Sequence, residues 1–194
     1  MKQFVFGLGN PGEEYQRTRH NVGYQVINAL TTLLTGQIFP QVAKEHHKTH
    51  SLFYRTGEIF LAESTTYMND SGKAVLGVLD YFDKDLVAAL KAGKPAGTAD
   101  QPALIVIYDD LDIPVGQLKV QFGKGPKVHN GVNSIRQHLG SDLFLHVRIG
   151  VDGRNGVRTL AGRDYVLTPF LGEEVSQVGT AIDAACTLLQ QRLR

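Results

Sequence analysis

The strongest strand signal in the chain is the run ALIVIYDD, residues 103–110. Its first six residues are apolar without a break, whereas a strand with one face in water alternates apolar and polar side chains. We therefore expect residues 103–108 to form a strand that is buried on both faces, inside a sheet. A strand of this kind needs a layer of helices on each side of its sheet.

Strand and helix patterns alternate on both sides of this run. Further strands are expected at residues 2–6, 51–55, 58–63, 117–122 and 144–151. Helices are expected at about residues 21–34, 74–82, 130–139 and 173–194. Residues 91–102 are rich in Gly, Pro and Ala and are expected to form an exposed loop. This order predicts an α/β fold: a three-layer single domain over residues 1–194, with a mixed, mostly parallel twisted central sheet flanked by helices.

Composition narrows the class of protein. The chain contains one cysteine, Cys186, so an internal disulfide is excluded and a reducing cytoplasmic compartment is expected. Cys186 lies on the apolar pattern of the last helix, where a free thiol is expected to be an inert core residue. We find neither an apolar run of about 18 residues nor a charged-then-apolar leader. A cytoplasmic protein that does not bind membranes is therefore expected, with a monomer as the default.

Charge is unevenly distributed, although the formal net charge is only +1. Residues 117–163 carry eight Lys or Arg and two Asp, a balance of +6. Residues 80–116 carry three Lys and seven Asp, a balance of −4. A basic lobe beside an acidic lobe is typical of a protein that guides a polyanion to one face, and ordinary solvated surface charge is the alternative.

The first strand ends in a glycine-rich turn, FGLGNPG at residues 6–12, which contains the pattern G-x-G-x-x-G. A dinucleotide-binding turn starts a helix at once and has an acidic residue about 20 residues later. Here a polar stretch follows, and neither Asp nor Glu occurs between Glu14 and Glu45, which argues against a dinucleotide site. The turn exposes Asn10, and the loop after it carries His20 and Asn21, polar side chains typical of a functional site. Asn21 is also expected to cap the following helix.

Four motifs occur in a fixed order: GLGNPGEEYQRTRHNVG (7–23), TTYMNDSG (65–72), YDDLDIPVG (108–116) and HNGVNSI (129–135). Together they resemble the bacterial-type peptidyl-tRNA hydrolase family, and the likeness extends from about residue 3 to YVLTPF at residues 165–170. The resemblance implies an enzyme that hydrolyses the ester bond between a peptide and tRNA. It also implies that peptidyl-tRNA is the partner and that no metal or other cofactor is needed.

The resemblance assigns roles to single residues. His20 would be the general base that activates water, oriented by the carboxylate of Asp109 at the end of the central strand. Five further residues would bind substrate, and the three asparagines among them are suited to stabilising the oxyanion: Asn10, Tyr15, Met68, Asn69 and Asn130. Helix capping is the alternative role for Asn69 and Asn130, and core packing is the alternative for Tyr15 and Met68.

The segment after the central strand carries two more aspartates, Asp110 and Asp112. Asp110 and Asp112 are expected to serve a solvated turn or a helix cap; together with Asp109 they offer three carboxylates to a divalent cation as the alternative. A non-catalytic RNA-binding protein of the same fold is the alternative function. The complete set of His20, Asp109 and the three asparagines argues against it, because a binding module would not need them.

The chain departs from the family pattern in two places. Before the HNG motif it reads GKGPKV at residues 123–128, with Val128 where the family usually has glycine. The two basic positions that hold the 5′-phosphate of tRNA in the family fall on Gln121 and His146. We expect four nearby cations to contact tRNA phosphates instead: Lys119, Lys124, Lys127 and Arg148.

Overall fold

The structure is a computed structural model that describes residues 1–157 and 159–193. Its strands are β1 (Gln3–Gly7), β2 (Lys44–His46), β3 (Ser51–Thr56), β4 (Ile59–Ser64), β5 (Leu104–Pro114), β6 (Leu118–Phe122) and β7 (Leu145–Asp152). Its α-helices are α1 (Val22–Thr35), α2 (Phe39–Val42), α3 (Ser71–Phe82), α4 (Lys84–Lys91), α5 (Asn130–Leu139), α6 (Gly162–Tyr165) and α7 (Glu174–Arg192). Short 3₁₀ helices lie at Glu13–Tyr15, Arg19–Asn21, His47–Thr49 and Met68–Asp70.

Within the described residues the strands form one seven-stranded sheet in the order β2-β3-β4-β1-β5-β7-β6. The four inner strands β4, β1, β5 and β7 run parallel to one another. The outer strands β2, β3 and β6 pair antiparallel. The side chains of residues 104–107 on β5 are fully buried. The prediction of a mixed sheet with residues 103–108 in its interior is therefore confirmed.

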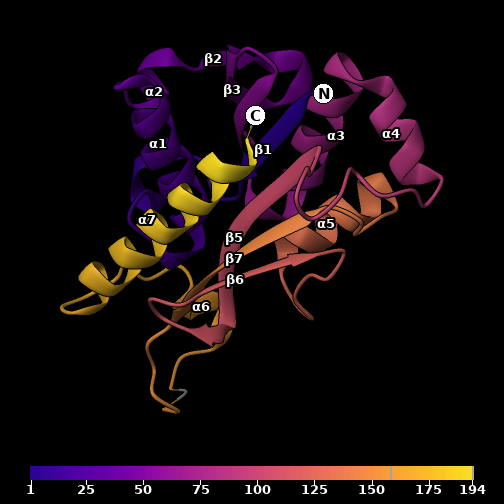
Figure 1. Cartoon of the computed structure of the whole chain (residues 1–194). Coiled ribbons are helices and arrows are strands. Elements are labelled where there is room, and N and C mark those ends of the chain that lie inside the picture. Colours follow the sequence, from indigo (N-terminus) through magenta and orange to yellow (C-terminus); the bar gives the residue numbers. More distant parts are fainter. Residues whose placement is uncertain (158, 194) are drawn as a thin grey trace.

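Helices cover both faces of this sheet, as Figure 1 shows. On one face α3, α4 and α5 pack through residues such as Val75 and Ile135. On the other face α1 and α7 pack through residues such as Val26 and Leu189. Cys186 is buried in this second core, and burial raises the pKa of its thiol to about 11. The predicted three-layer arrangement is confirmed. No helix in the described part of the chain is long and apolar enough to span a membrane.

Five elements in the described part of the chain differ from the sequence-based expectations: α2, β2, α4 and α6 lie where none was predicted, and β5 is longer than expected. α4 lies at Lys84–Lys91, where the sequence patterns predict no helix, and its first turn is capped by Asp83, which accepts the N–H of Leu86 at 3.1 Å. β5 continues past its apolar run to Pro114 because its pairing with β7 continues there after an irregularity. Asp110 is therefore a strand residue and only 4% exposed. The expectation that it is solvated is wrong.

The end of β1 and the start of α1 approach each other closely. A Cβ on Gly7 would lie 2.4 Å from the carbonyl oxygen of Gly23, a contact that only glycine avoids. α1 does not begin until Val22, which agrees with the argument against a dinucleotide-binding turn. The loops after β1, β4 and β5 meet at the carboxyl edge of the parallel strands, the edge at which α/β proteins bind ligands.

Candidate active site

The turn after β1 is fixed by the side chain of Asn21. Its Oδ1 accepts the backbone N–H of Asn10 at 2.9 Å, and its Nδ2 donates to the backbone carbonyl of Asn10 at 2.8 Å. Asn21 makes no side-chain cap on α1, so the expected capping role is wrong. The amide of Asn10 is in turn oriented by Met68, whose backbone N–H donates to Asn10 Oδ1 at 2.8 Å. The Nδ2 group of Asn10 is therefore the one available to a ligand in the cavity described below.

His20 and Asp109 meet across the fold. The backbone N–H of His20 donates to the carbonyl of Val166 at 2.8 Å, which anchors the residue. Nδ1 of the His20 ring lies 2.8 Å from Oδ1 of Asp109. An ionised carboxylate only accepts hydrogen bonds, so the proton is on Nδ1 and the second nitrogen, Nε2, is the basic one. The structure thus brings together the two residues that the resemblance implied.

A second histidine shares the same carboxylate oxygen. Nε2 of His129 lies 3.0 Å from Asp109 Oδ1, and Nδ1 of His129 accepts the backbone N–H of Val132 at 3.3 Å. His129 is thus protonated on Nε2 and caps α5 through Nδ1. The sequence patterns predicted no role for His129. Its position immediately before Asn130, at the start of a predicted helix, was the available signal.

The electrostatics of this group favour a positive charge on His20. For Asp109, burial alone would raise the pKa, but the attraction of His20 and His129 and their hydrogen bonds hold it well below its usual range. For His20, burial alone would lower the pKa, but the charge and hydrogen bond of Asp109 outweigh burial and raise it above 6.5. The site therefore stabilises the imidazolium that a general base forms when it accepts a proton.

These groups line one open cavity of about 920 Å³. Seven of the predicted site residues line it: Asn10, His20, Met68, Asn69, Asp109, Lys127 and Asn130. Asn69 and Asn130 are both exposed there. Neither asparagine is the capping residue of the helix beside it, because those positions are taken by Asp70 and His129. Their amides are therefore available to a bound molecule.

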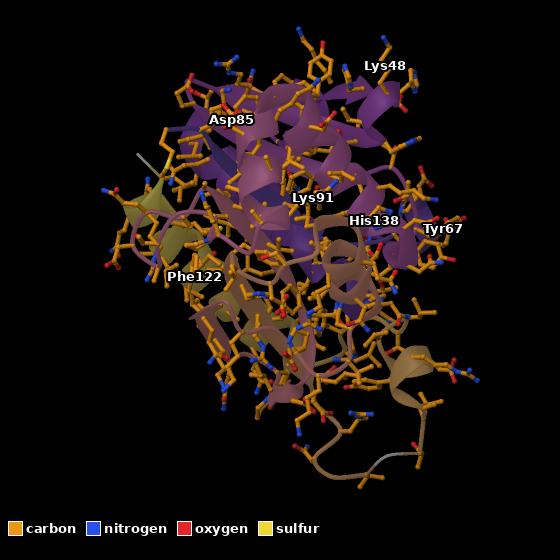
Figure 2. All side chains as sticks on the ribbon, turned by 90° about the vertical axis from the view of Figure 1, so that its right-hand side faces the viewer. Lys48, Tyr67, Asp85, Lys91, Phe122 and His138 are labelled. Carbon is orange, nitrogen blue, oxygen red and sulfur yellow. The ribbon has the colours of Figure 1, made fainter. Side chains whose placement is uncertain are left out.

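Met68 and Tyr15 lie differently from each other. Met68 is 4% exposed and packs beneath the cavity against Gly131, where a Cβ would lie 2.5 Å from its Sδ. Tyr15 is not part of the described cavity lining. Its ring meets that of Tyr67 edge to face, with centroids 6.3 Å apart, and Tyr67 is an exposed surface residue (Figure 2). Of these two residues, Met68 lines the cavity and Tyr15 lies outside its described lining.

The four cations expected to bind phosphate fall into two groups. Lys119, Lys124 and Lys127 are exposed. Arg148 is buried: its Nε donates to Asp110 at 2.6 Å and its Nη1 donates to Gln121 at 2.8 Å. The expectation that Arg148 contacts phosphate is corrected by this pairing, because its guanidinium is engaged inside the protein.

The two positions that are basic in the family, and that are Gln121 and His146 here, face each other on neighbouring strands. Gln121 on β6 pairs with His146 on β7. His146 is fully buried, with Nδ1 3.0 Å from the hydroxyl of Tyr108, and burial lowers its pKa to about 4. His146 is therefore neutral near pH 7, and neither position presents a positive charge to solvent.

Arg19 fastens the loop of His20 to the segment after β7. Its guanidinium lies over the rings of Tyr165 and Phe170, 4.2 and 4.8 Å from their centroids. Its Nη2 donates to the carboxylate of Glu174 at 2.7 Å. Arg19 is 3% exposed, so these contacts are shielded from water. The wall of the cavity that carries α6 is thereby held against the turn that carries His20.

Among the described residues, one group has the donor set of a metal site: His20, Asp109 and His129, whose donor atoms lie within 4.8 Å of one another. The two nitrogens lie at hydrogen-bond distances from a single oxygen, so a metal ion would have to displace both protons. Asp110 does not complete a carboxylate cluster with Asp109, because it pairs with Arg148. The geometry fits a hydrogen-bonded triad.

Fold and cavity together define an α/β protein with a buried His-Asp pair at the carboxyl edge of its sheet, an arrangement suited to general-base chemistry. The family model described as peptidyl-tRNA hydrolase matches residues 4–194. The chain belongs to the peptidyl-tRNA hydrolase family.

Individual relatives agree with this assignment. A peptidyl-tRNA hydrolase from Bacillus thuringiensis subsp. konkukian is 34% identical over 196 residues, which covers 98% of this chain and 92% of that protein. One from Bacillus pumilus is 38% identical over 187 residues, covering 95% and 88%. The crystal structure of peptidyl-tRNA hydrolase from Acinetobacter baumannii matches with a TM-score of 0.78 and 27% identity, covering 99% of this chain and 88% of that one. The resemblance found in the sequence is confirmed.

Proposed function

We propose that this protein hydrolyses the ester bond between the peptide and the tRNA of peptidyl-tRNA, using His20 as the base. Its family supports the reaction. The observation that carries the assignment of the base is the single oxygen of Asp109, which accepts hydrogen bonds from His20 and His129 at the cavity. No metal ion or other cofactor is part of the proposal.

The reaction begins with removal of a proton from water. Nε2 of His20 accepts this proton, and the resulting hydroxide oxygen forms a bond to the ester carbonyl carbon. Asp109 balances the positive charge of the imidazolium, while His129 holds the carboxylate in place. When the tetrahedral intermediate collapses, the bond to the ribose oxygen breaks and His20 returns its proton to that oxygen. The products are the peptide acid and tRNA with a free hydroxyl.

Three asparagines supply the donors that this reaction needs. Asn10 presents its Nδ2 because its Oδ1 is held by Met68, and Asn69 and Asn130 line the same cavity. Their amides stabilise the negative oxygen of the intermediate and hold the terminal ribose. Removal of one such donor typically costs about 100-fold in rate.

The exposed lysines provide the approach for tRNA. Lys119 lies on β6, and Lys124 and Lys127 lie on the loop that leads to His129. Lys127 also lines the cavity, so the three lysines form a path from β6 at the edge of the sheet to the cavity. We place the acceptor end of tRNA along this path, where phosphate contacts give affinity without base specificity.

We also propose that the chain acts as a single-domain, cytoplasmic monomer. Its substrate arises where proteins are synthesised, which supports the compartment. The cavity combines residues from the turn after β1, from β5 and from α5 of one chain, which supports a site that needs no second copy.

The test is peptide release from N-acetyl-aminoacyl-tRNA in the presence of EDTA. The wild type is expected to release the peptide, and His20→Asn is expected to be slower by about 10²- to 10⁴-fold while still binding tRNA. His47→Asn is the matched control, because the side chain of His47 is 86% exposed, and its rate is expected to equal that of the wild type.

Two outcomes would contradict the proposal. If the wild type binds tRNA but releases no peptide, the protein is an RNA-binding module with the fold of an enzyme. If EDTA abolishes release and a divalent cation restores it, the triad of His20, Asp109 and His129 requires a metal ion.

A further inference from the structure

The loop between β6 and α5, residues 123–129, is bonded to the rest of the protein at both ends. At its start, the backbone N–H of Gly123 donates to the carbonyl of Phe144 at 2.9 Å. At its end, the ring of His129 belongs to the hydrogen-bonded triad. The loop contains two glycines, Gly123 and Gly125, and glycine restricts the backbone less than any other residue. The order of its middle part therefore depends on contacts with other elements.

One side chain bonds the middle of this loop. Nη2 of Arg136, on α5, donates to the carbonyl of Pro126 at 3.1 Å. In the described part of the chain this is the one hydrogen bond to residues 124–128. A Cβ on Gly125 would lie 2.6 Å from the same Nη2 and 2.9 Å from Cε1 of His146. The loop therefore lies directly on these two side chains, and Pro126 is buried there.

Arg136 is itself held in place. Its Nε donates to the carboxylate of Asp142 at 2.7 Å, and its Nη1 donates to the side-chain oxygen of Asn133 at 3.0 Å. The ring of His146 beside it is fully buried and lies 3.0 Å from the hydroxyl of Tyr108 on β5. All three nitrogens of the guanidinium are thus in use, and Asp142 balances its charge. Arg136 therefore acts on the loop and not directly on a phosphate.

The loop carries two of the lysines on the proposed path of tRNA. Lys127 directly follows Pro126 and lines the cavity, and Lys124 lies two residues before it. Both lysines are exposed, and neither forms an ion pair with any residue that the structure describes. When a binding conformation is only partly populated, the apparent affinity falls in proportion to that population. A loop that is already held in place presents both charges without this loss.

We propose that Arg136 is a positioning residue for tRNA binding, because it holds residues 124–128 in the conformation in which the two lysines of the loop meet phosphates. The inference rests on the proposed function, in which tRNA is the polyanion. The hydrogen bonds of His129 do not involve Arg136. Loss of the contact with the loop is therefore expected to change KM and not kcat.

The experiment measures kcat and KM of Arg136→Lys for an N-acetyl-aminoacyl-tRNA. Lysine keeps the charge opposite Asp142, but one ammonium cannot replace three separate nitrogens, so the bond to Pro126 is lost. If the loop then holds its binding conformation for about a tenth of the time, KM rises about tenfold while kcat stays within about twofold. Gly125→Ala displaces the loop from the other side, because its Cβ would contact Nη2, and is expected to raise KM in the same way.

Arg55→Lys is the matched control. Arg55 also donates to one backbone carbonyl, that of Gly57, and to one carboxylate, that of Glu58. It lies on β3, near the opposite edge of the sheet from β6, and its substitution is expected to leave KM unchanged. The side chain of Arg136 is 29% exposed, so Arg136→Lys is expected to fold as the wild type does, which circular dichroism verifies.

A second measurement separates positioning from a general loss of structure. In the background Lys124→Ala/Lys127→Ala, the loop has no cation to position. Arg136→Lys is expected to raise KM by less than about twofold in this background, although it raises KM about tenfold in the wild-type background.

The outcomes that overturn the assignment are distinct from failure of the proposed function. An unchanged KM in both Arg136→Lys and Gly125→Ala overturns it, and so does a fall in kcat at unchanged KM. A tenfold rise that persists without the two lysines also overturns it, since Arg136 would then act elsewhere. If the wild type releases no peptide, the proposed function fails. The Kd of uncharged tRNA for the wild type and for Arg136→Lys then decides the positioning role by itself.

Discussion

Asp109→Asn separates the charge of this residue from its hydrogen bonds. In the wild type, His20 and His129 both donate to one oxygen, Oδ1, at 2.8 and 3.0 Å. The carbonyl oxygen of an asparagine in the same place accepts both bonds, so both tautomers and both ring positions are kept. The negative charge beside Nδ1 of His20 is lost, and the second carboxylate oxygen becomes an NH₂ group.

The expected loss follows from the 2.8 Å contact between His20 and Asp109. Two unit charges at this separation interact by about 6 kcal/mol at an effective dielectric constant of about 20, which is an upper limit because the amide dipole retains part of the attraction. A loss of about 3 kcal/mol in the transition state corresponds to a decrease in kcat/KM on the order of 100-fold. Without the charge of Asp109, burial dominates and the pKa of His20 falls below 6.5.

The assay is the pH dependence of kcat/KM for an N-acetyl-aminoacyl-tRNA. A base must be neutral to act, so wild-type activity is lost as the pH falls through the raised pKa of His20, above 6.5. In Asp109→Asn we expect a lower kcat/KM at high pH. We also expect its activity to be lost at a lower pH than in the wild type. Asp112→Asn, the same change at an exposed neighbour, is expected to leave the pH profile in place. If kcat/KM of Asp109→Asn reached the wild-type value at high pH, the reasoning would be refuted. An unshifted pH profile in this variant would also refute it.

Three other substitutions test separate parts of the structure. His129→Asn is expected to change the free energy of unfolding by less than about 1 kcal/mol, because asparagine also caps the N–H of Val132. Its kcat/KM is expected to fall about tenfold, because the carboxylate of Asp109 loses one hydrogen-bond donor. Arg19→Lys is expected to lower the free energy of unfolding by about 2–4 kcal/mol in urea titrations, because the stacked guanidinium and its bond to Glu174 are lost. Glu63→Gln is expected to raise Tm at pH 8 and not at pH 5. Burial raises the pKa of Glu63 from 4.5 to about 8, so between these values the folded protein holds a proton that the unfolded chain has released, and stability falls as the pH rises.

Two of these substitutions have a matched control variant, and the third has an outcome that would contradict it. Arg17→Lys, at an exposed neighbour of Arg19, is expected to leave the unfolding curve unchanged, and an equal loss in both variants would contradict the role of the buried contacts. Glu58→Gln lies on the same hairpin as Glu63 but is exposed, and a similar pH-dependent gain there would contradict the role of burial. A large loss of stability in His129→Asn would show that the ring does more for α5 than cap it.

Local patterns in the sequence were sufficient for most elements. The helix expected at residues 130–139 is α5, and the unbroken apolar run at residues 103–108 lies within β5, because periodicity and apolar length are properties of neighbouring residues. α4 was missed because it has only eight residues, of which Val87 and Leu90 are buried, so its apolar pattern spans little more than two turns. The family motifs selected His20, Asp109 and the asparagines, since each motif is a contiguous turn at the end of a strand or the start of a helix.

The amino-acid sequence thus determined most of the elements, the order of layers and seven of the residues that line the cavity. Only the tertiary structure decided which polar atoms meet. Asp109 bonds His20 and His129, 89 and 20 residues away, and Arg148 bonds Asp110, 38 residues away. Parallel strands are joined by long crossovers, so side chains that are adjacent at one sheet edge are distant in the chain. For the same reason, the sequence does not show that Arg148 pairs with Asp110 inside the protein and is not a phosphate ligand. The pairing of the strands shows it.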